Sequence, residues 1–433
     1  MSIVAEIKLW GTTIGAVMLE DGNKIATFQY DYDFITSGVE IAPLMMPLSK
    51  QIYSFPNLAL GSFHGLPGLL SDSLPDTFGN ALINSWLASQ GRSLESFNAI
   101  ERLCYTGSRG MGALEFVPSK EPSFSQNSSV SIDELVRLAG KVLSKQSNLE
   151  TNIKEESSKA MADILRVGTS AGGARAKAVI AWNKKTNEIR SGQLKASSGF
   201  EYWLIKFDGV KNNKDKELED PEGYGAIEYA YYKMAKSCGI NMSECRLFEE
   251  NGRRHFMTRR FDRPLGDKLH MQSLAAIAHL DFNRAGAYSY EQAFDIMRRL
   301  NLSATATEEL FRRMIFNVVA RNQDDHVKNI AFLMDRKGVW SLSPAYDMTY
   351  SYQLLGLWTS KHQMTINGKQ DDFSIVDFEE CGKKALLKQG QAKNIVKTVL
   401  DVVGNWRDYA DDSKVKSQHR EQIQKVLRLN SLL

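Results

Sequence analysis

The spacing of apolar residues changes near residue 270 of this 433-residue chain, and this change limits the folds that the chain can adopt. Before it, apolar and polar residues alternate in short runs. Glu250-Asn251-Gly252 is a hairpin-type turn between two of these runs, which is typical of β-strands. From about 271 onward, apolar residues recur at helical spacing, except in one β-rich patch at 330–343. The pattern predicts an α+β protein in which a β-rich part precedes a helical part.

The residues before about 132 are predicted to form a separate unit. Residues 3–30 hold two β-rich runs around the turn at 20–23, and short helices are expected within 63–91, so a small α+β subdomain should end near Pro118. The stretch SKEPSFSQNSSVS that follows has the composition of a linker. The predicted organisation is therefore a subdomain at 1–118, a linker at 119–131, a β-rich part at 132–270 and a helical part at 271–433.

Composition and charge exclude several classes of protein. Hydrophobic residues make up 43% of the chain and charged residues 24%, which is ordinary for a globular protein and argues against collagen, coiled coil or wholesale disorder. The net charge of +3 gives no argument for direct binding to nucleic acid. The four cysteines lack metal-ligand spacing, and neither a signal peptide nor a membrane-length apolar run is apparent. We therefore expect reduced thiols, a cytoplasmic location and no contact with a membrane.

A run of polar residues from Arg321 to Asn329 directly follows an apolar helical stretch, so it should form a loop on a rigid support. Asp324 and Asn329 are five residues apart, and Asp347 comes after a predicted hairpin. Protein kinases use this order: an Asp accepts the hydroxyl proton, an Asn five residues later binds metal, and an Asp beyond a hairpin holds Mg²⁺. Asp324 and Asp325 could instead cap a loop. Asp325 could also replace Asp324 as the base, although only Asp324 has the spacing of five.

Two further parts of a phosphoryl-transfer site are present upstream. Lys206 lies inside the apolar strand candidate YWLIKF, where a purely structural lysine is costly, although an edge strand would tolerate one. A glycine-rich turn, VGTSAGGARAK at 167–177, would let backbone amides approach phosphates closely. It matches neither the Walker A motif nor Gly-x-Gly-x-x-Gly, and by itself it is also compatible with an ordinary flexible hairpin.

The motifs GTSAGGARAK, WLIKF, RRFDR, NQDDHVKN and SPAYDM occur in this order, and together they resemble the HipA family of serine/threonine kinases. Near the N-terminus, LWGTTIGAV, LLSDSLPDTFGN and MGALEFVPS are similar to the N-terminal subdomain of that family. The resemblance implies a toxin kinase of a type II toxin–antitoxin module. It also implies a protein-kinase-like two-part body, with a β-rich N-terminal part and an all-helical C-terminal part, behind the small α+β subdomain.

The resemblance assigns roles to individual residues. Asp324 would be the catalytic base, with His326 and Asn329 as its partners in the catalytic loop and as ATP contacts, and Asn329 and Asp347 would hold Mg²⁺. Ser170 would be autophosphorylated, with the neighbouring Thr169 as the competing acceptor, although Arg175 stands where the best-known relative has Gln. Glu228 could pair with Lys206 or simply be a solvated helix residue. The implied ATP-binding residues are Gly168, Thr169, Ser170, Gly172, Gly173, Lys206, Arg259, Arg260, His326, Asn329 and Asp347.

The resemblance also implies cofactors and partners. ATP and Mg²⁺ would be used, and a HipB-like helix-turn-helix antitoxin would bring the chain to operator DNA as a co-repressor. The phosphorylated protein would be a translation component, such as the aminoacyl-tRNA synthetase for glutamate. Two alternatives remain open at this point: a small-molecule kinase of the same superfamily, and a mainly DNA-associated regulatory subunit.

Overall fold

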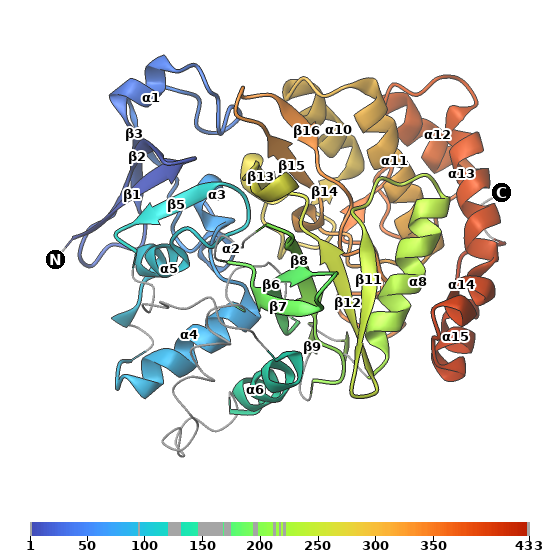
Figure 1. Cartoon of the computed structure of the whole chain (residues 1–433). Helices are drawn as coiled ribbons and strands as arrows, with labels where there is room; N and C mark the ends of the chain where they lie inside the picture. The colour runs from blue at the N-terminus through green and yellow to red at the C-terminus, as the bar shows by residue number, and fades with distance from the viewer. Residues whose placement is uncertain are drawn as a thin grey trace.

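A computed structural model of the chain describes residues 2–93, 96–119, 131–145, 168, 175–193, 198–210, 214–215, 218–219 and 222–430. Figure 1 shows three regions in chain order: an N-terminal β-rich unit with short helices, a central antiparallel sheet, and a group of helices that ends at the C-terminus. The central sheet lies between the other two regions. This order agrees with the α+β architecture predicted from the change in hydrophobic spacing.

The N-terminal unit is built on a five-stranded antiparallel sheet in the order β4-β3-β2-β1-β5. Its strands are β1 (Ile3–Leu9), β2 (Thr12–Leu19), β3 (Thr27–Tyr30), β4 (Ile52–Ser54) and β5 (Leu114–Val117). Its helices are α1 (Tyr32–Thr36), α2 (Leu60–Phe63), α3 (Gly68–Ser71), α4 (Thr77–Ser89) and α5 (Ala99–Thr106). The first of the two predicted β-rich runs is in fact two strands, because Trp10 and Gly11 both take a positive φ and reverse the chain.

The central sheet has the order β11-β12-β8-β6-β7, and every pairing in it is antiparallel. Its strands are β6 (Lys177–Asn183), β7 (Glu188–Ser191), β8 (Glu201–Lys206), β11 (Cys245–Glu250) and β12 (Arg253–Arg259). The predicted turn between β11 and β12 is confirmed, with positive φ at Asn251 and Gly252. In β8, Lys206 is in register with Lys177 on one neighbour and with Phe256 on the other.

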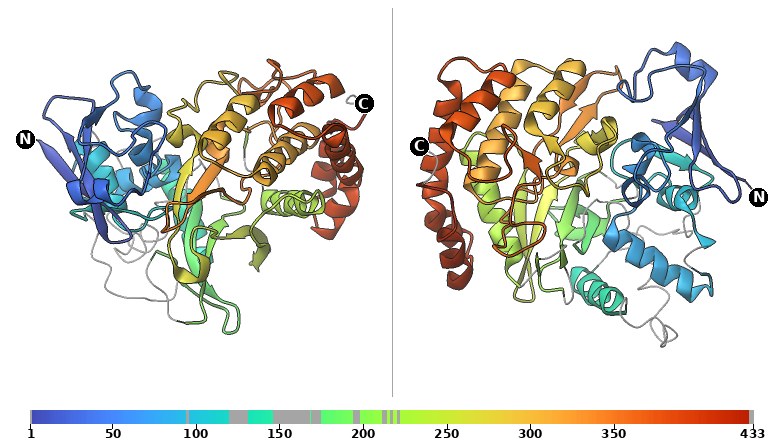
Figure 2. Two further views of the ribbon diagram at one scale, coloured as in Figure 1. Left: turned by 90° about the horizontal axis from the view of Figure 1, so that it is seen from above. Right: turned by 180° about the vertical axis from the view of Figure 1, so that it is seen from behind.

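Helix α8 (Tyr224–Ser237) packs on β11 and β12 with one face and on the C-terminal helices with the other. The remaining helices are α6 (Ile132–Lys145), α9 (Leu274–Ile277), α10 (Tyr290–Arg299), α11 (Ala304–Val319), α12 (Ile375–Lys384), α13 (Gln391–Gly404), α14 (Trp406–Asp412) and α15 (Ser417–Gln424). Figure 2 shows the later helices gathered on the side of the molecule opposite the N-terminal unit.

The helical part also contains short strands that the helical spacing after residue 271 does not predict. The expected patch at 330–343 is present as β15 (Ala331–Met334) and β16 (Trp340–Leu342), and β13 (His270–Ser273) pairs with β15. A parallel pair joins β14 (Tyr288–Ser289) to β17 (Met364–Thr365). Outside the helical part, β9 (Lys214–Asp215) and β10 (Leu218–Glu219) form a short antiparallel pair. The C-terminal part is therefore helical with small sheets added, because β13, β14 and β17 are too short to leave a repeating pattern.

Three hydrophobic cores hold the described residues together. One is formed by the N-terminal unit together with Met334 of β15. Another lies inside the helical part, where it is lined by α8, α10, α11 and α13. The third core is shared, because it joins Phe78 and Leu82 of α4, Leu135 of α6, and Trp203 and Ile205 of β8. The division into 1–118 and 132–270 stays a prediction, and the packing of these two segments is continuous.

Candidate active site

The polar run predicted to carry chemistry begins where α11 ends. The buried face of α11 packs into the helical core, and the helix stops as Arg321 takes a left-handed conformation with φ of 57°. The Asn322 N–H then donates to the Asn317 carbonyl, which closes the last turn. Residues 322–326 form a loop, a 3-10 turn covers Val327–Asn329, and the chain enters β15. The polar groups therefore lie between two packed elements.

Lys206 joins two carboxylates that come from different parts of the fold. Its Nζ lies 2.6 Å from Glu228 Oε1 on α8 and 2.6 Å from Asp347 Oδ1, which follows β16. Burial alone would lower the pKa of Lys206, but the charges of Asp347 and Glu228 outweigh it and raise this pKa above its ordinary value. Lys206 is therefore a cation at neutral pH, and the helix glutamate considered as its partner does contact it.

Asp347 remains ionised for the same reason. Burial would raise the pKa of Asp347, but the nearby charges of Lys206 and Lys177 lower it to about 2. Its side chain is 34% exposed, so the carboxylate is accessible from one side. The preceding Tyr346 donates its hydroxyl to the Lys328 carbonyl at 2.6 Å, which ties the Asp347 segment to the 322–329 loop.

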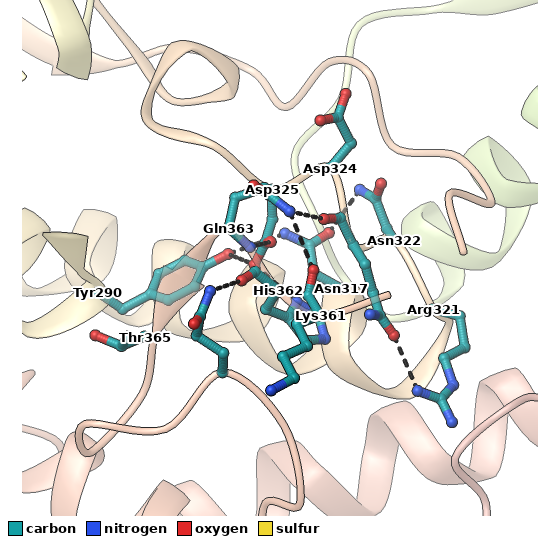
Figure 3. Close-up of polar contacts among 12 residues, drawn as sticks. Tyr290, Asn317, Arg321, Asn322, Asp324, Asp325, Lys361, His362, Gln363 and Thr365 are labelled. Atoms are coloured by element: carbon teal, nitrogen blue, oxygen red, sulfur yellow. Dashed lines mark hydrogen bonds and ion pairs between the residues drawn. The ribbon is translucent and has the colours of Figure 1, made fainter. Parts of the chain in front are cut away.

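Asp324 and Asn329 lie on the same loop and contact each other. Asn329 Nδ2 donates to the Asp324 carbonyl at 2.8 Å, so the spacing of five corresponds to a direct contact. Asp324 Oδ1 accepts a hydrogen bond from Trp358 Nε1 at 2.6 Å, and Oδ2 lies 3.8 Å from His326 Nε2. In Figure 3 the Asp324 carboxylate points away from the hydrogen-bonded network beneath it.

Asp325 occupies that network instead. Its Oδ2 accepts from Tyr290 Oη and faces His362 Nδ1, each at 2.9 Å, while Oδ1 accepts from the Gln363 N–H at 2.8 Å (Figure 3). Burial would raise the pKa of Asp325, but the His362 contact and these hydrogen bonds hold it below its ordinary value. Asp325 is 3% exposed and accepts three hydrogen bonds, so it anchors the loop.

The two arginines expected to bind ATP, Arg259 and Arg260, make contacts with other residues of the chain. Arg259 Nη2 is 3.7 Å from Glu201, and its side chain is 41% exposed. Arg260 is buried and binds Asp262 through Nε at 2.9 Å and Nη2 at 2.6 Å. The structure therefore places Arg260 in an ion-pair cluster near the N-terminal unit and does not bring either arginine to Lys206. Their role in binding ATP stays a prediction.

Most of the glycine-rich turn lies outside the described residues, including Thr169, Ser170, Gly172 and Gly173. Gly168 is described and buried, and a side chain there would meet Leu82 Cδ1 at 2.6 Å. At the other end of the turn, the Arg175 guanidinium lies 3.8 Å from the centre of the Tyr224 ring. Arg175 and Tyr224 line a small pocket together with Lys206, Glu228 and Phe256.

Lys177 is a member of this site that the sequence reasoning missed. It is buried, its Nζ lies 3.3 Å from Asp76 Oδ2, and it is in register with Lys206 on the adjacent strand. The available signal was a lysine that opens the apolar strand KAVIAW, just as Lys206 closes another. Trp358 was also missed, because its contact with Asp324 depends on how the chain returns after β16.

Asn329 and Asp347 offer oxygen ligands of the kind that Mg²⁺ takes. Asn329 uses its Nδ2 as a donor, so its amide oxygen is an acceptor, and Asp347 contributes an ionised carboxylate. Hard oxygen ligands of this kind suit Mg²⁺, which takes its other ligands from phosphates and water. Over the described part of the chain, no cluster of three or more His, Cys, Asp or Glu side chains could hold a metal without such help.

A β-rich part that supplies a partly buried lysine, joined to a helical part that supplies a polar loop, defines a protein-kinase-like two-part body. A family model described as the HipA-like C-terminal domain matches residues 169–406, and one described as the HipA N-terminal domain matches residues 5–117. The chain therefore belongs to the HipA family.

Two curated relatives carry provisional kinase names. Y4mE of Sinorhizobium fredii is 26% identical over 204 residues, which is 43% of this chain and 47% of the relative. A Haemophilus influenzae protein is 28% identical over 159 residues, which is 33% of this chain and 46% of the relative. Each match thus spans about half the length of the relative.

A solved structure is similar over almost the whole chain. It is a chain of the complex of HipA, HipB and operator DNA from the Shewanella oneidensis MR-1 toxin–antitoxin system. The TM-score is 0.66, with 16% identity, and the match covers 97% of this chain and 94% of that one. At this identity the likeness concerns the fold. Separately, none of the helices in the described ranges has the length and apolar character needed to span a membrane.

Proposed function

We propose that this chain is an ATP-dependent serine/threonine-protein kinase that acts as the toxin of a type II toxin–antitoxin module. The observation that carries the proposal is the position of Lys206, within 2.6 Å of both Glu228 and Asp347, while Asp324 and Asn329 share the adjoining loop. A lysine paired with a helix glutamate, together with a metal-binding Asp, is the arrangement that protein kinases require. The kinase names of two relatives agree with it.

Asp324 is the residue proposed to orient the substrate hydroxyl. Its carboxylate points away from the network in Figure 3, whereas both oxygens of Asp325 are engaged with Tyr290, His362 and Gln363. An acceptor held in place by Trp358 Nε1 can receive the hydroxyl proton without reorganising. The geometry therefore favours Asp324 over Asp325 as the base.

Lys206, Asp347 and Asn329 are proposed to hold the nucleotide. Lys206 carries a positive charge at neutral pH and would bind phosphate oxygens, with Lys177 and Arg175 as further cations beside it. The amide oxygen of Asn329 and the carboxylate of Asp347 would hold Mg²⁺. When bound, that ion neutralises charge on the phosphates. Gly168 and the glycine-rich turn, with Arg259 and Arg260, remain proposed ATP contacts.

The remaining parts of the proposal concern regulation and partners. Ser170 is the proposed autophosphorylation site. A HipB-like antitoxin is the proposed partner through which the chain reaches operator DNA. The similar fold of a chain in the Shewanella oneidensis complex of HipA, HipB and operator DNA supports this part of the proposal. The proposed substrate is a protein serine in a translation component, for which glutamyl-tRNA synthetase is the candidate.

The test is Asp324→Asn in the full chain, assayed with labelled ATP and a cell lysate as the source of substrate. Loss of a general base should lower phosphate transfer about 10²- to 10⁴-fold while the protein stays folded. Asp295→Asn, an exposed aspartate on α10, is the matched control and should keep full activity. Activity of Asp324→Asn equal to wild type would contradict the assigned role.

The same assay separates the proposal from the two alternatives. A protein kinase leaves label on protein bands in a gel, whereas a small-molecule kinase consumes ATP without labelling any band. A regulatory subunit that only binds antitoxin and DNA would do neither. Induced expression should also arrest growth for the wild type and not for Asp324→Asn.

A further inference from the structure

Three leucines on the segment after Asp347 are exposed to an unusual degree. Leu354 is 73% exposed, Leu355 is 89% exposed and Leu357 is 99% exposed. Single exposed apolar residues are common on protein surfaces, but several within four positions form a patch that calls for a partner. We refer to residues 352–358 as the leucine loop.

Both ends of the leucine loop are attached to the loop that carries Asp324. At its start, Ser351 N–H donates to the Arg321 carbonyl at 3.0 Å, and Gln323 N–H donates to the Ser351 carbonyl at 2.9 Å. At its end, Trp358 Nε1 donates to Asp324 Oδ1 at 2.6 Å. The ends of the leucine loop are therefore attached beside the proposed catalytic carboxylate of Asp324, and the leucines extend from this attachment.

Hydrogen bonds to backbone carbonyls of the leucine loop also fix its shape. Gly356 N–H donates to the Gln353 carbonyl at 3.0 Å, which forms a tight turn with the leucines on it. Gln363 Nε2 donates to the Trp358 carbonyl at 2.6 Å. These hydrogen bonds give partners to backbone carbonyls of the leucine loop, while the leucine side chains face solvent.

We propose that the leucine loop is the docking surface for the protein substrate, and that the substrate carries an apolar side chain close to its phosphorylated residue. This inference rests on the proposed kinase function. Leu355 is three residues from Trp358, so the two residues can be at most about 10 Å apart. An extended substrate segment spans the same distance in about three residues. The apolar residue should therefore lie within about four positions of the acceptor serine.

A polypeptide fits these features better than a small molecule does. A small nucleophile that reaches Asp324 would leave the three leucines uncovered, whereas an extended segment can place its acceptor at Asp324 and an apolar side chain on the leucines. Alternation of side chains along an extended segment allows both contacts at once. The antitoxin and a second copy of the chain are the other occupants that the test must distinguish.

The test uses serine-centred peptide libraries in which one position at a time is fixed as Leu, Ser, Asp or Lys. The wild-type chain should prefer Leu at one or more positions within four residues of the serine. The variant Leu354→Ser/Leu355→Ser/Leu357→Ser should raise KM for the preferred peptide about tenfold, as expected from losing one buried apolar contact, with kcat and the KM for ATP unchanged.

A matched control replaces three exposed apolar residues elsewhere: Ile52→Ser/Val376→Ser/Leu386→Ser. It should leave every constant unchanged, and both triple variants should melt at the wild-type temperature because the replaced side chains are exposed. An unaltered peptide KM in the leucine-loop variant would overturn the docking proposal while the kinase function stands. An unaltered peptide KM together with lost antitoxin binding or a changed oligomeric state would also overturn the docking proposal. A wild-type chain that transfers no phosphate to protein or peptide would overturn the kinase function and the docking proposal together.

Discussion

At the scale of single residues, the charge on Lys206 is the largest of the influences that lower the pKa of Asp347. The folded chain holds the pKa of Asp347 at about 2, below the ordinary value of 3.8, because the charges of Lys206 and Lys177 outweigh burial. A depressed folded-state pKa contributes stability above the unfolded value, and this contribution is lost as pH falls through the folded value. Asp347 thus stabilises the fold above about pH 4 and less toward pH 2.

Lys206→Met should remove that contribution. The wild type should melt at a higher temperature than the variant near pH 7, and this difference should shrink as pH falls below about 4. Phosphate transfer should fall about 100-fold, as expected for loss of a partly buried cation at developing charge. Thermal melts from pH 2.5 to 8 provide the measurement. Lys233→Met is the control, because Lys233 pairs with the exposed Asp412. A difference in melting temperature between wild type and Lys206→Met that does not change with pH would contradict the prediction.

A second residue-level prediction concerns the Asp325 network. Arg428 Nη1 lies 3.1 Å from His362 Nε2, and a guanidinium can only donate, so Nε2 accepts and Nδ1 carries the proton that faces Asp325. His362→Phe removes both ring nitrogens, so it breaks this chain at its centre and should cost about 3 kcal/mol of unfolding free energy. Tyr290→Phe removes one of three donors and should cost about 1 kcal/mol.

Urea denaturation of both variants measures the difference in unfolding free energy. The His362 variant should also lose activity, because Asp325 anchors the loop that holds Asp324. Equal costs for the two variants would mean that His362 is no more important to the Asp325 carboxylate than Tyr290 is.

At the scale of elements, the approach of α8 to β12 places Glu228 beside Lys206. Gly225, in the first turn of α8, lies so close to β12 that a Cβ there would be 2.2 Å from the Arg254 carbonyl oxygen. Gly225→Ala should therefore push α8 away from the sheet. We expect lower stability and a lower rate of phosphate transfer, because Glu228 lies three residues further along the same helix.

Gly140→Ala is the matched control for the Gly225 variant. Gly140 lies within α6, and a Cβ at that position meets no atom within 4 Å. The alanine should stabilise the helix by about 0.5–1 kcal/mol and leave activity unchanged. If the contact with Arg254 is the cause, thermal denaturation should show opposite changes in stability for the two variants, and steady-state kinetics should change for Gly225→Ala alone.

At the scale of the whole molecule, a buried ion-pair cluster attaches the N-terminal unit to the central sheet. Asp262 binds both Arg260 and Arg263, and it also accepts a hydrogen bond from the Gly112 N–H at 2.8 Å. Arg263 Nη2 in turn donates to the Gly110 carbonyl at 2.9 Å. Residues 110–112 precede β5, so this cluster links two regions that also share a hydrophobic core.

Asp262→Asn should weaken this attachment. It leaves two buried arginines with an uncompensated charge, which should cost about 3–5 kcal/mol of unfolding free energy. Asp267→Asn, at an exposed position five residues away, should change stability by less than about 0.5 kcal/mol. Urea denaturation and limited proteolysis between the two regions are the measurements. A small cost for Asp262→Asn would show that the shared core alone holds the two regions together.

The sequence predicted the elements that depend on neighbouring residues. The turn at Asn251-Gly252 and the β-rich patch at 330–343 are present because local φ preferences and hydrophobic spacing act over a few residues. The same reasoning from neighbouring residues did not predict the reversal of chain direction at Trp10-Gly11. A non-glycine residue with positive φ leaves little signal in the sequence.

What the sequence determined by itself is the set of reactive groups and their local spacing. Asp324 and Asn329 contact each other because five residues of loop and 3-10 turn place them so. Only the tertiary structure decided which distant groups meet: Lys206 with Glu228 and Asp347, Lys177 with Asp76, and Trp358 with Asp324. Such contacts depend on how sheets and helices pack around shared cores, and packing joins residues far apart in the chain without any periodicity that a sequence could display.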